Sequence, residues 1–190
     1  MKKVIYTLSA ALIAGSVSAQ VVSTAQIHVS DGAVMSIGQD FQNKGELTNN
    51  GQINFRKNLE NNGQLKSDGS VVFDGLGAQT VSGTNDVVLS KVTIENDVDL
   101  KTSLQVNEEL TYDQGIVSSS QENQLVFGKD ANAYGASDFS HSTGVVTKLQ
   151  AENFEFPVGD GNTYRGFEAN SLNNSNLSAE YKAQDPREFS

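Results

Sequence analysis

Residues 41–73 read FQNKGELTNNGQINFRKNLENNGQLKSDGSVVF, with an apolar residue at every sixth position. The register begins earlier in the chain, and its eight members are Val29, Met35, Phe41, Leu47, Ile53, Leu59, Leu65 and Val71. A period of six fits neither an α-helix, which repeats every 3.6 residues, nor a long strand, which repeats every two. It favours short strands separated by tight corners, as in a repeat protein.

Short turn sequences lie between the apolar positions and recur in the same register. They are Asn43-Lys44-Gly45, Asn49-Asn50-Gly51, Asn61-Asn62-Gly63 and Ser67-Asp68-Gly69. Gly and Asn adopt positive φ values that other residues resist. We therefore expect these corners to be built on residues with positive φ.

Three hexads make one coil, about 18 residues long, if each strand forms one face of a prism. The segments 53–55 (INF) and 71–73 (VVF) are separated by three hexads and are alike, which supports this length. Stacked coils place like residues over like, so aligned asparagines can form hydrogen-bonded ladders. A series of hairpins with Asn-Gly turns is the alternative, but hairpins do not require one fixed period. The sequence predicts an all-β fold, a parallel β-solenoid over residues 20–140, and leaves its handedness open.

Beyond residue 84 the hexad fades, although short β-branched or alternating runs continue. These runs are 87–89, 92–94, 98–100, 104–106, 115–117 and 125–127. From residue 141 to residue 190 we expect a smaller β segment with strands at 144–149, 164–169 and 177–181 and, over 154–161, a strand that runs into a sharp turn. We find no pattern for a capping element, so we expect an incomplete segment that belongs to a longer protein.

The first 19 residues have the pattern of a secretory signal peptide. Lys2 and Lys3 precede an apolar stretch over residues 4–17, and Val17-Ser18-Ala19 forms a cleavage pattern of small residues. The stretch is too short and too interrupted to favour a membrane-spanning helix. We therefore expect export in a Gram-negative bacterium, with a mature chain that begins at Gln20.

Charge and cysteine content narrow the function classes. Loss of Lys2 and Lys3 with the signal peptide leaves 11 basic and 23 acidic residues, a net charge of −12. Such a chain lacks the basic surface that nucleic acid requires, so we expect no nucleic-acid partner. The sequence contains no cysteine, so it has neither disulfides nor a cysteine-linked lipid anchor.

Several segments resemble a recurrent pattern in large secreted proteins of Bacteroidetes bacteria. The first part of the pattern is GSVVFDG at 69–75, QTVSG at 79–83 and VTIEN at 92–96. It continues with LTY at 110–112, GIV at 115–117, GVV at 144–146, FEFPVG at 154–159 and YR at 164–165. The resemblance covers about residues 40–185.

This resemblance implies a role at the cell surface. Such proteins are commonly exported by the type IX secretion system, and many are gliding-associated or adhesin-like. The sorting domain of the family normally lies at the end of a long chain, and residues 141–190 do not carry it. The resemblance therefore implies that this sequence corresponds to the N-terminal portion of such a protein.

Residues suited to catalysis are scarce. The chain has no cysteine and no Gly-x-Ser-x-Gly motif, and its near-neutral bases are His28 and His141. We interpret His28 as an exposed strand residue and His141 as a loop residue. We therefore expect a protein that is not an enzyme and that holds no cofactor.

Three acidic residues form the densest group of candidate metal ligands. Glu95, Asp97 and Asp99 lie close together in the sequence, and Ca²⁺ prefers several oxygen ligands. The repeats of calcium-binding β-rolls and the EF-hand loop are absent from the sequence. We interpret the group as a solvated face, with weak Ca²⁺ binding as the alternative.

Four residues near the C-terminus are candidates for binding. Phe154 and Phe156 are two residues apart in one expected strand, so their side chains point to the same face. They form either an exposed platform for a sugar or a small core that the turn at 157–161 closes. We favour the core. Tyr164 and Arg165 are candidate ligand contacts, with cation–π or surface packing as the favoured interpretation.

The leading hypothesis is a rigid scaffold or adhesin-like surface module that binds a protein or a surface glycan. One alternative is an accessory subunit of an outer-membrane secretion or motility complex. Another is a protein that binds or cleaves polysaccharide, which requires carboxylates converging beside exposed aromatic residues.

Overall fold

The computed structural model describes residues 19–183 and contains strands and turns but no helix in that range. The predicted signal peptide, apart from Ala19, lies outside the described residues. The first nine strands are β1 (Gln20–Ser23), β2 (Gln26–Val29), β3 (Val34–Ile37), β4 (Asp40–Asn43), β5 (Glu46–Asn49), β6 (Gln52–Phe55), β7 (Leu59–Asn61), β8 (Gln64–Phe73) and β9 (Gln79–Ser82). The others are β10 (Val87–Ile94), β11 (Val98–Leu100), β12 (Leu104–Tyr112), β13 (Val117–Ser118), β14 (Leu125–Phe127), β15 (Asn132–Tyr134), β16 (Ser142–Thr143), β17 (Val146–Phe156) and β18 (Phe167–Ala179). No helix in this range is long and apolar enough to cross a membrane.

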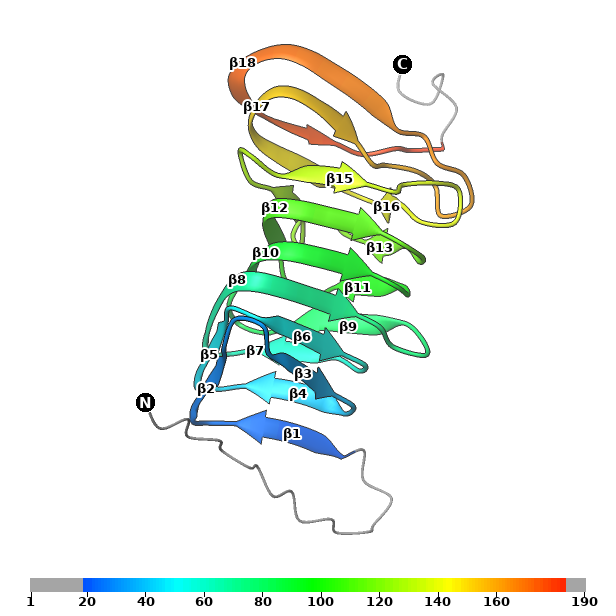
Figure 1. Ribbon diagram of the computed structural model, residues 1–190. Helices are drawn as coiled ribbons and strands as arrows, with labels where there is room; N and C mark the ends of the chain where they lie inside the picture. Colours follow the sequence, from blue (N-terminus) through cyan, green and yellow to red (C-terminus); the bar gives the residue numbers. More distant parts are fainter. Residues whose placement is uncertain (1–18, 184–190) are drawn as a thin grey trace.

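The strands stack as the successive coils of a parallel β-solenoid with three faces (Figure 1). The first face is a parallel sheet in the order β1-β4-β7-β9-β11-β13-β16, one strand from each of seven coils. The second face runs through β2, β5, β8, β10, β12, β14 and β17. The third face contains β3, β6, β15 and the second halves of β8, β10 and β12. The predicted fold class is confirmed.

The strand register confirms the expected coil length over the hexad region. Leu47 lies beside Leu65, and the segment 53–55 lies beside 71–73, so these partners are three hexads apart. Later coils are less regular. Leu104 pairs with Val87 on one side and with Leu125 on the other, so its two partners lie at unequal offsets along the chain.

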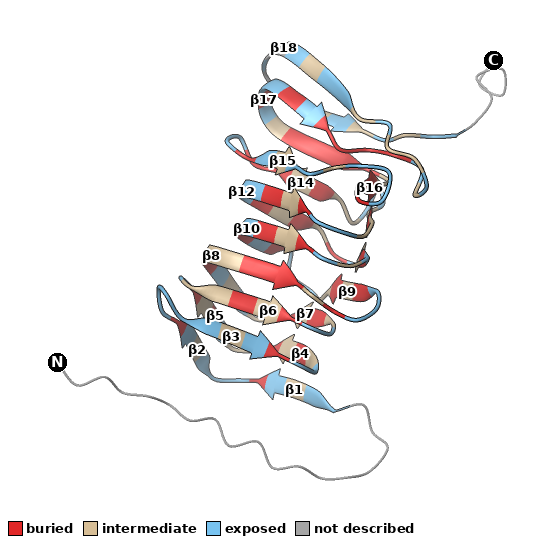
Figure 2. Ribbon diagram, turned by 45° about the vertical axis from the view of Figure 1, so that its right-hand side comes forward, coloured by how far each residue is buried: buried red, intermediate tan, exposed pale blue. Residues whose placement is uncertain are grey.

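The hexad residues belong to, or pack against, one shared core. Buried positions recur in successive coils of the stack (Figure 2). Leu47, Ile53 and Leu59 are at most 1% exposed, and Leu65 is partly buried against the same core. A column of aromatic rings lies inside the prism, where the third-face strands end beside the first face. Its rings are those of Phe41, Phe55 and Phe73, with centroids 5.9 and 5.8 Å apart.

Buried asparagines form the expected ladder at the corners. Asn43 donates through Nδ2 to Asn61 Oδ1 at 2.9 Å and accepts a hydrogen bond from the Gly45 amide. Asn49 occupies the equivalent place on the next corner and donates to Ser67 Oγ at 3.0 Å. These side chains are buried, so their mutual hydrogen bonds replace those that water would supply.

The expected reason for the corner glycines is wrong. The glycines with positive φ are Gly32, Gly83, Gly115, Gly135, Gly144 and Gly161, and none belongs to the hexad turns. In the turns, a Cβ would instead collide with the coil below. On Gly63 it would lie 2.2 Å from the Gly45 carbonyl oxygen, and on Gly69 it would lie 2.1 Å from that of Gly51. The close approach of neighbouring coils, and not the backbone conformation, therefore requires glycine here.

The C-terminal part differs from expectation in two respects. Parallel pairing continues past residue 140 through β16 and β17, because apolar residues of β17 still fill the core. The expected absence of a capping element is also wrong, since β18 pairs antiparallel with β17 and covers the edge of the last coil (Figure 1). Phe167 of β18 stacks on Phe156 of β17 with centroids 5.2 Å apart. The reversal at 157–166 was not recognisable from the hexad pattern, which has faded by this point.

Candidate functional site

A hollow of about 920 Å³ lies at the corner where the third face passes to the first. Its lining includes Gly38, Arg56, Asp74 and Glu95, each of which directly follows a third-face strand. They form a column because the last residues of β3, β6, β8 and β10 are register partners. The same hollow is bordered by Lys57, by the fully exposed Leu76 and by Gln79.

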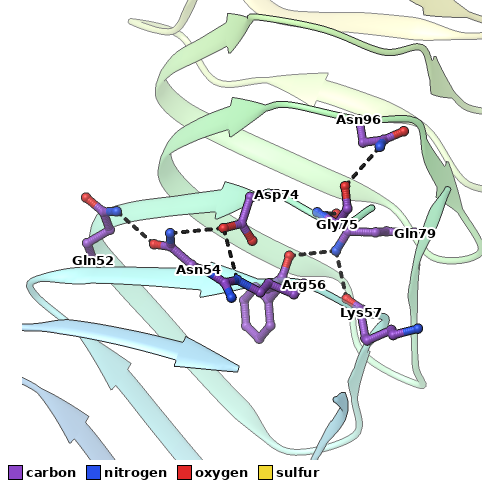
Figure 3. Close-up of polar contacts among 9 residues, drawn as sticks. Gln52, Asn54, Arg56, Lys57, Asp74, Gly75, Gln79 and Asn96 are labelled. Atoms are coloured by element: carbon purple, nitrogen blue, oxygen red, sulfur yellow. Dashed lines mark hydrogen bonds and ion pairs between the residues drawn. The ribbon is translucent and has the colours of Figure 1, made fainter. Parts of the chain in front are cut away.

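The side chain of Gln79 hydrogen-bonds to backbone groups beside this hollow (Figure 3). Its side chain is 1% exposed and donates through Nε2 to the carbonyls of Phe55, at 2.7 Å, and Lys57, at 2.8 Å. Its Oε1 accepts a hydrogen bond from the Gly75 amide at 2.7 Å. Asn96 then donates to the Gly75 carbonyl at 2.9 Å. One side chain thus satisfies backbone groups of two successive coils where the chain leaves the sheet.

Replacing Gln79 with leucine is expected to destabilise the protein by about 3 kcal/mol, because three backbone groups lose their partners in a buried corner. Gln79→Glu is the matched variant. Glutamate keeps the shape of the side chain and the acceptor for the Gly75 amide, but it places a second oxygen against the carbonyls of Phe55 and Lys57. We therefore expect a loss of stability at least as large as that of the leucine variant. Urea unfolding followed by circular dichroism measures both. Wild-type stability in either variant would contradict this role.

The Asp74 side chain, which also lines the hollow, is 14% exposed. Its Oδ2 accepts a hydrogen bond from Asn54 Nδ2 at 3.3 Å and lies 3.5 Å from Arg56 Nε (Figure 3). The other oxygen, Oδ1, is buried without a hydrogen-bond partner. The Arg56 side chain is 60% exposed, so this ion pair contributes little to stability and leaves the guanidinium accessible.

The hollow offers groups for polar recognition. Arg56 and Lys57 supply donors, Asp74 and Glu95 supply acceptors, and Leu76 supplies an exposed apolar contact. Its lining contains no hydroxyl, thiol or imidazole side chain. The arrangement is therefore suited to binding through hydrogen bonds. The sequence-based prediction named Glu95 but missed Arg56 and Lys57, although the regular spacing of positions 38, 56 and 74 was a signal for the column.

The three acidic candidates do not form one group, although Glu95 and Asp97 both line a second hollow of about 380 Å³. Asp97 Oδ1 accepts a hydrogen bond from the Ile116 amide at 2.8 Å, and Asp99 lies 2.7 Å from Lys101 Nζ. Glu95 is exposed and lines the hollow. Within residues 19–183, no group of three or more His, Cys, Asp or Glu side chains is placed to hold a metal ion.

The aromatic candidates belong to the core. Phe154 and Phe156 are 4% and 0% exposed, and their rings contact each other edge-on at 4.9 Å. They do not form an exposed platform for a sugar. Tyr164 donates to Glu155 Oε1 at 2.7 Å, and the Arg165 guanidinium lies 5.7 Å from the centre of the Tyr181 ring. Tyr164 and Arg165 thus take part in surface packing.

The two histidines have different surroundings. His28 is exposed on β2, as expected. His141 lies in the loop directly before β16, as expected, but it is fully buried. Its Nε2 accepts a hydrogen bond from the Gly161 amide at 3.0 Å, so Nδ1 carries the proton and donates to the Ser137 carbonyl at 2.9 Å. Both nitrogens are used to tie loops together.

Two further buried polar groups are structural. Lys148 donates through Nζ to the carbonyls of Gly128, Lys129 and Ala131, and burial lowers the pKa of its ammonium group. The Tyr112 hydroxyl hydrogen-bonds to Ser142 Oγ, and burial raises the pKa of the phenol. Both are enclosed in the last coils and face no hollow described above.

The hollow at the corner of the coils is therefore the candidate binding site. Comparison of the chain with protein families, curated proteins and solved structures found no match.

Proposed function

We propose that this chain is an exported, non-catalytic β-solenoid that serves as a stiff spacer or adhesive module at the surface of a Gram-negative cell. The observation that supports this proposal most directly is the parallel stack of seven coils, which share backbone hydrogen bonds along all three faces. At an inter-strand spacing of about 4.8 Å, seven coils extend for roughly 30 Å along the axis.

The interior of the stack favours rigidity without disulfides. The aromatic column and the asparagine ladder connect neighbouring coils, so a coil cannot open without exposing core residues of its neighbours. The chain contains no cysteine. A module of this kind resists proteolysis and force outside the cell, where the predicted signal peptide would send it.

Two measurements test the proposal: whether the chain is at the cell surface, and how much force it withstands. Intact cells that express the chain with its own signal peptide are treated with protease, and the chain is detected before and after lysis. A protease site is introduced beside Gly77, in an exposed loop. We expect the protease to cleave this site in intact cells. We also expect cooperative unfolding at high force in single-molecule pulling. A chain retained inside the cell, or one that extends at low force, would contradict the proposal.

Carbohydrate binding is a second candidate, and a specific feature favours it. A neighbouring hollow of about 380 Å³ shares Glu95 with the first and is bordered by Phe139, whose side chain is 85% exposed. Exposed aromatic and acidic groups along one corner suit a glycan. We expect the wild-type chain to bind members of a glycan panel and Phe139→Ala to lose this binding. If the wild-type chain releases reducing ends from a polysaccharide, the protein cleaves the glycan and does not only bind it.

A further inference from the structure

The first coil, residues 20–37, presents an open edge on each of its three faces. Within residues 19–183, β1 pairs with β4, β2 with β5 and β3 with β6, and none of the three has a partner on its other side. In the following coils, strands such as β4 and β5 pair on both sides. The N-terminal end of the stack is thus a ring of unpaired strands.

Hydrogen bonds between the first two coils identify the backbone groups that face outward. The carbonyls of Ser23, Val29 and Ile37 accept hydrogen bonds from the amides of Lys44, Asn50 and Arg56 at 2.7, 2.8 and 3.0 Å. Successive residues of a strand direct their backbone groups to opposite sides. The amide and carbonyl groups of Val22, His28 and Ser36 therefore point away from the second coil and lack a strand partner within the described chain.

The edge has none of the features that usually block strand pairing. Natural sheet edges carry lysines, prolines or inward-pointing charges that prevent association. Residues 20–37 contain no lysine, arginine, glutamate or proline, and Asp31 is their single charged side chain. Cleavage before Gln20 adds one α-amino group at the start of β1. Val21, Ile27 and Met35 are partly buried and pack against the core at this open end. An edge with so few charges beside incompletely covered apolar residues favours association.

We propose that two copies of the mature chain join end to end through their first coils, with strands antiparallel across a two-fold axis. A second copy fits because β1, β2 and β3 each have four residues and the same alternation of burial. A two-fold arrangement closes at the dimer and does not grow into a fibre. Each copy contributes the segment 20–37, close in size to the roughly 20 to 30 residues per side of a typical stable interface.

This inference rests on the proposed export, because removal of residues 1–19 makes Gln20, the first residue of β1, the start of the chain. The exported protein is purified, and mass spectrometry determines its N-terminus. A start other than Gln20 refutes the proposed cleavage, and the dimer is then tested on a chain produced from Gln20 onward. The two failures are thus distinguishable.

Sedimentation velocity and amide hydrogen exchange test the dimer. We expect a dimer at micromolar concentration, with the amides of Val22, His28 and Ser36 exchanging at least tenfold more slowly than after dilution to the monomer. A monomer whose outward amides exchange freely overturns the proposal. Slow exchange in a monomer means that the edge is covered by the chain itself, which also overturns it.

A matched pair of variants isolates the backbone contact. His28→Pro removes an outward amide without breaking a hydrogen bond to the second coil, and proline is tolerated at such edge positions. His28→Ala changes the same exposed side chain and keeps the amide. We expect at least a tenfold weaker dimer for the first variant and no change for the second. If His28→Pro does not fold, Val22→Pro, with Val22→Ala as its control, removes another outward amide and provides the same comparison.

Discussion

Replacing Gly63 with alanine is expected to destabilise the protein by about 3 kcal/mol, at the upper end of overpacking effects. The added Cβ would lie 2.2 Å from the Gly45 carbonyl oxygen and 2.9 Å from the Gly45 nitrogen. Both atoms belong to the backbone of the coil below, and the carbonyl accepts a hydrogen bond from the Gln64 amide at 2.9 Å. Relief of the contact therefore requires the two coils to separate at the corner. Urea unfolding measures the loss.

Gly77→Ala is the control for this prediction. No atom lies within 4 Å of a Cβ at Gly77, and its φ is not positive. We expect a change within about 0.5 kcal/mol, with a slight gain in stability from the less flexible unfolded chain. Equal effects of the two substitutions would show that contact between coils does not determine the glycine positions.

Truncating Phe55 to alanine is expected to cost about 3 to 5 kcal/mol. The ring is 1% exposed and lies between Phe41 and Phe73, so its loss leaves a cavity in the aromatic column. Phe73 belongs to the next coil, so its ring cannot close the cavity without changing the coil spacing. Thermal and urea unfolding of the purified variant measure the effect.

Phe139→Ala provides the comparison for Phe55. It removes a ring of the same size that is 85% exposed, so we expect a stability change within about 0.5 kcal/mol. Phe55→Leu, which keeps most of the buried volume, should fall between the two alanine variants. A Phe55→Ala variant as stable as Phe139→Ala would mean that the column is not what holds the coils together.

The candidate site could be predicted only in part. The favoured interpretation of the aromatic pair as a small core is confirmed, since Phe154 is buried. Asp97 and Asp99 have local partners. The hollow instead joins Arg56 to Asp74, which belong to successive coils. A residue's exposure and its neighbours depend on how the coils stack, and this information is not contained in the spacing within one hexad.

The sequence by itself determined the coil. An apolar residue at every sixth position specifies which side chains face inward, and this local property is sufficient to predict three short strands per coil. It also predicted the asparagine ladder, because a repeat of three hexads places Asn43 beside Asn61. The tertiary structure decided what depends on the distance between coils. The glycine at position 63 is required by the carbonyl of Gly45 in the preceding coil, and β18 reverses to cover β17 because the last coil leaves an open edge there.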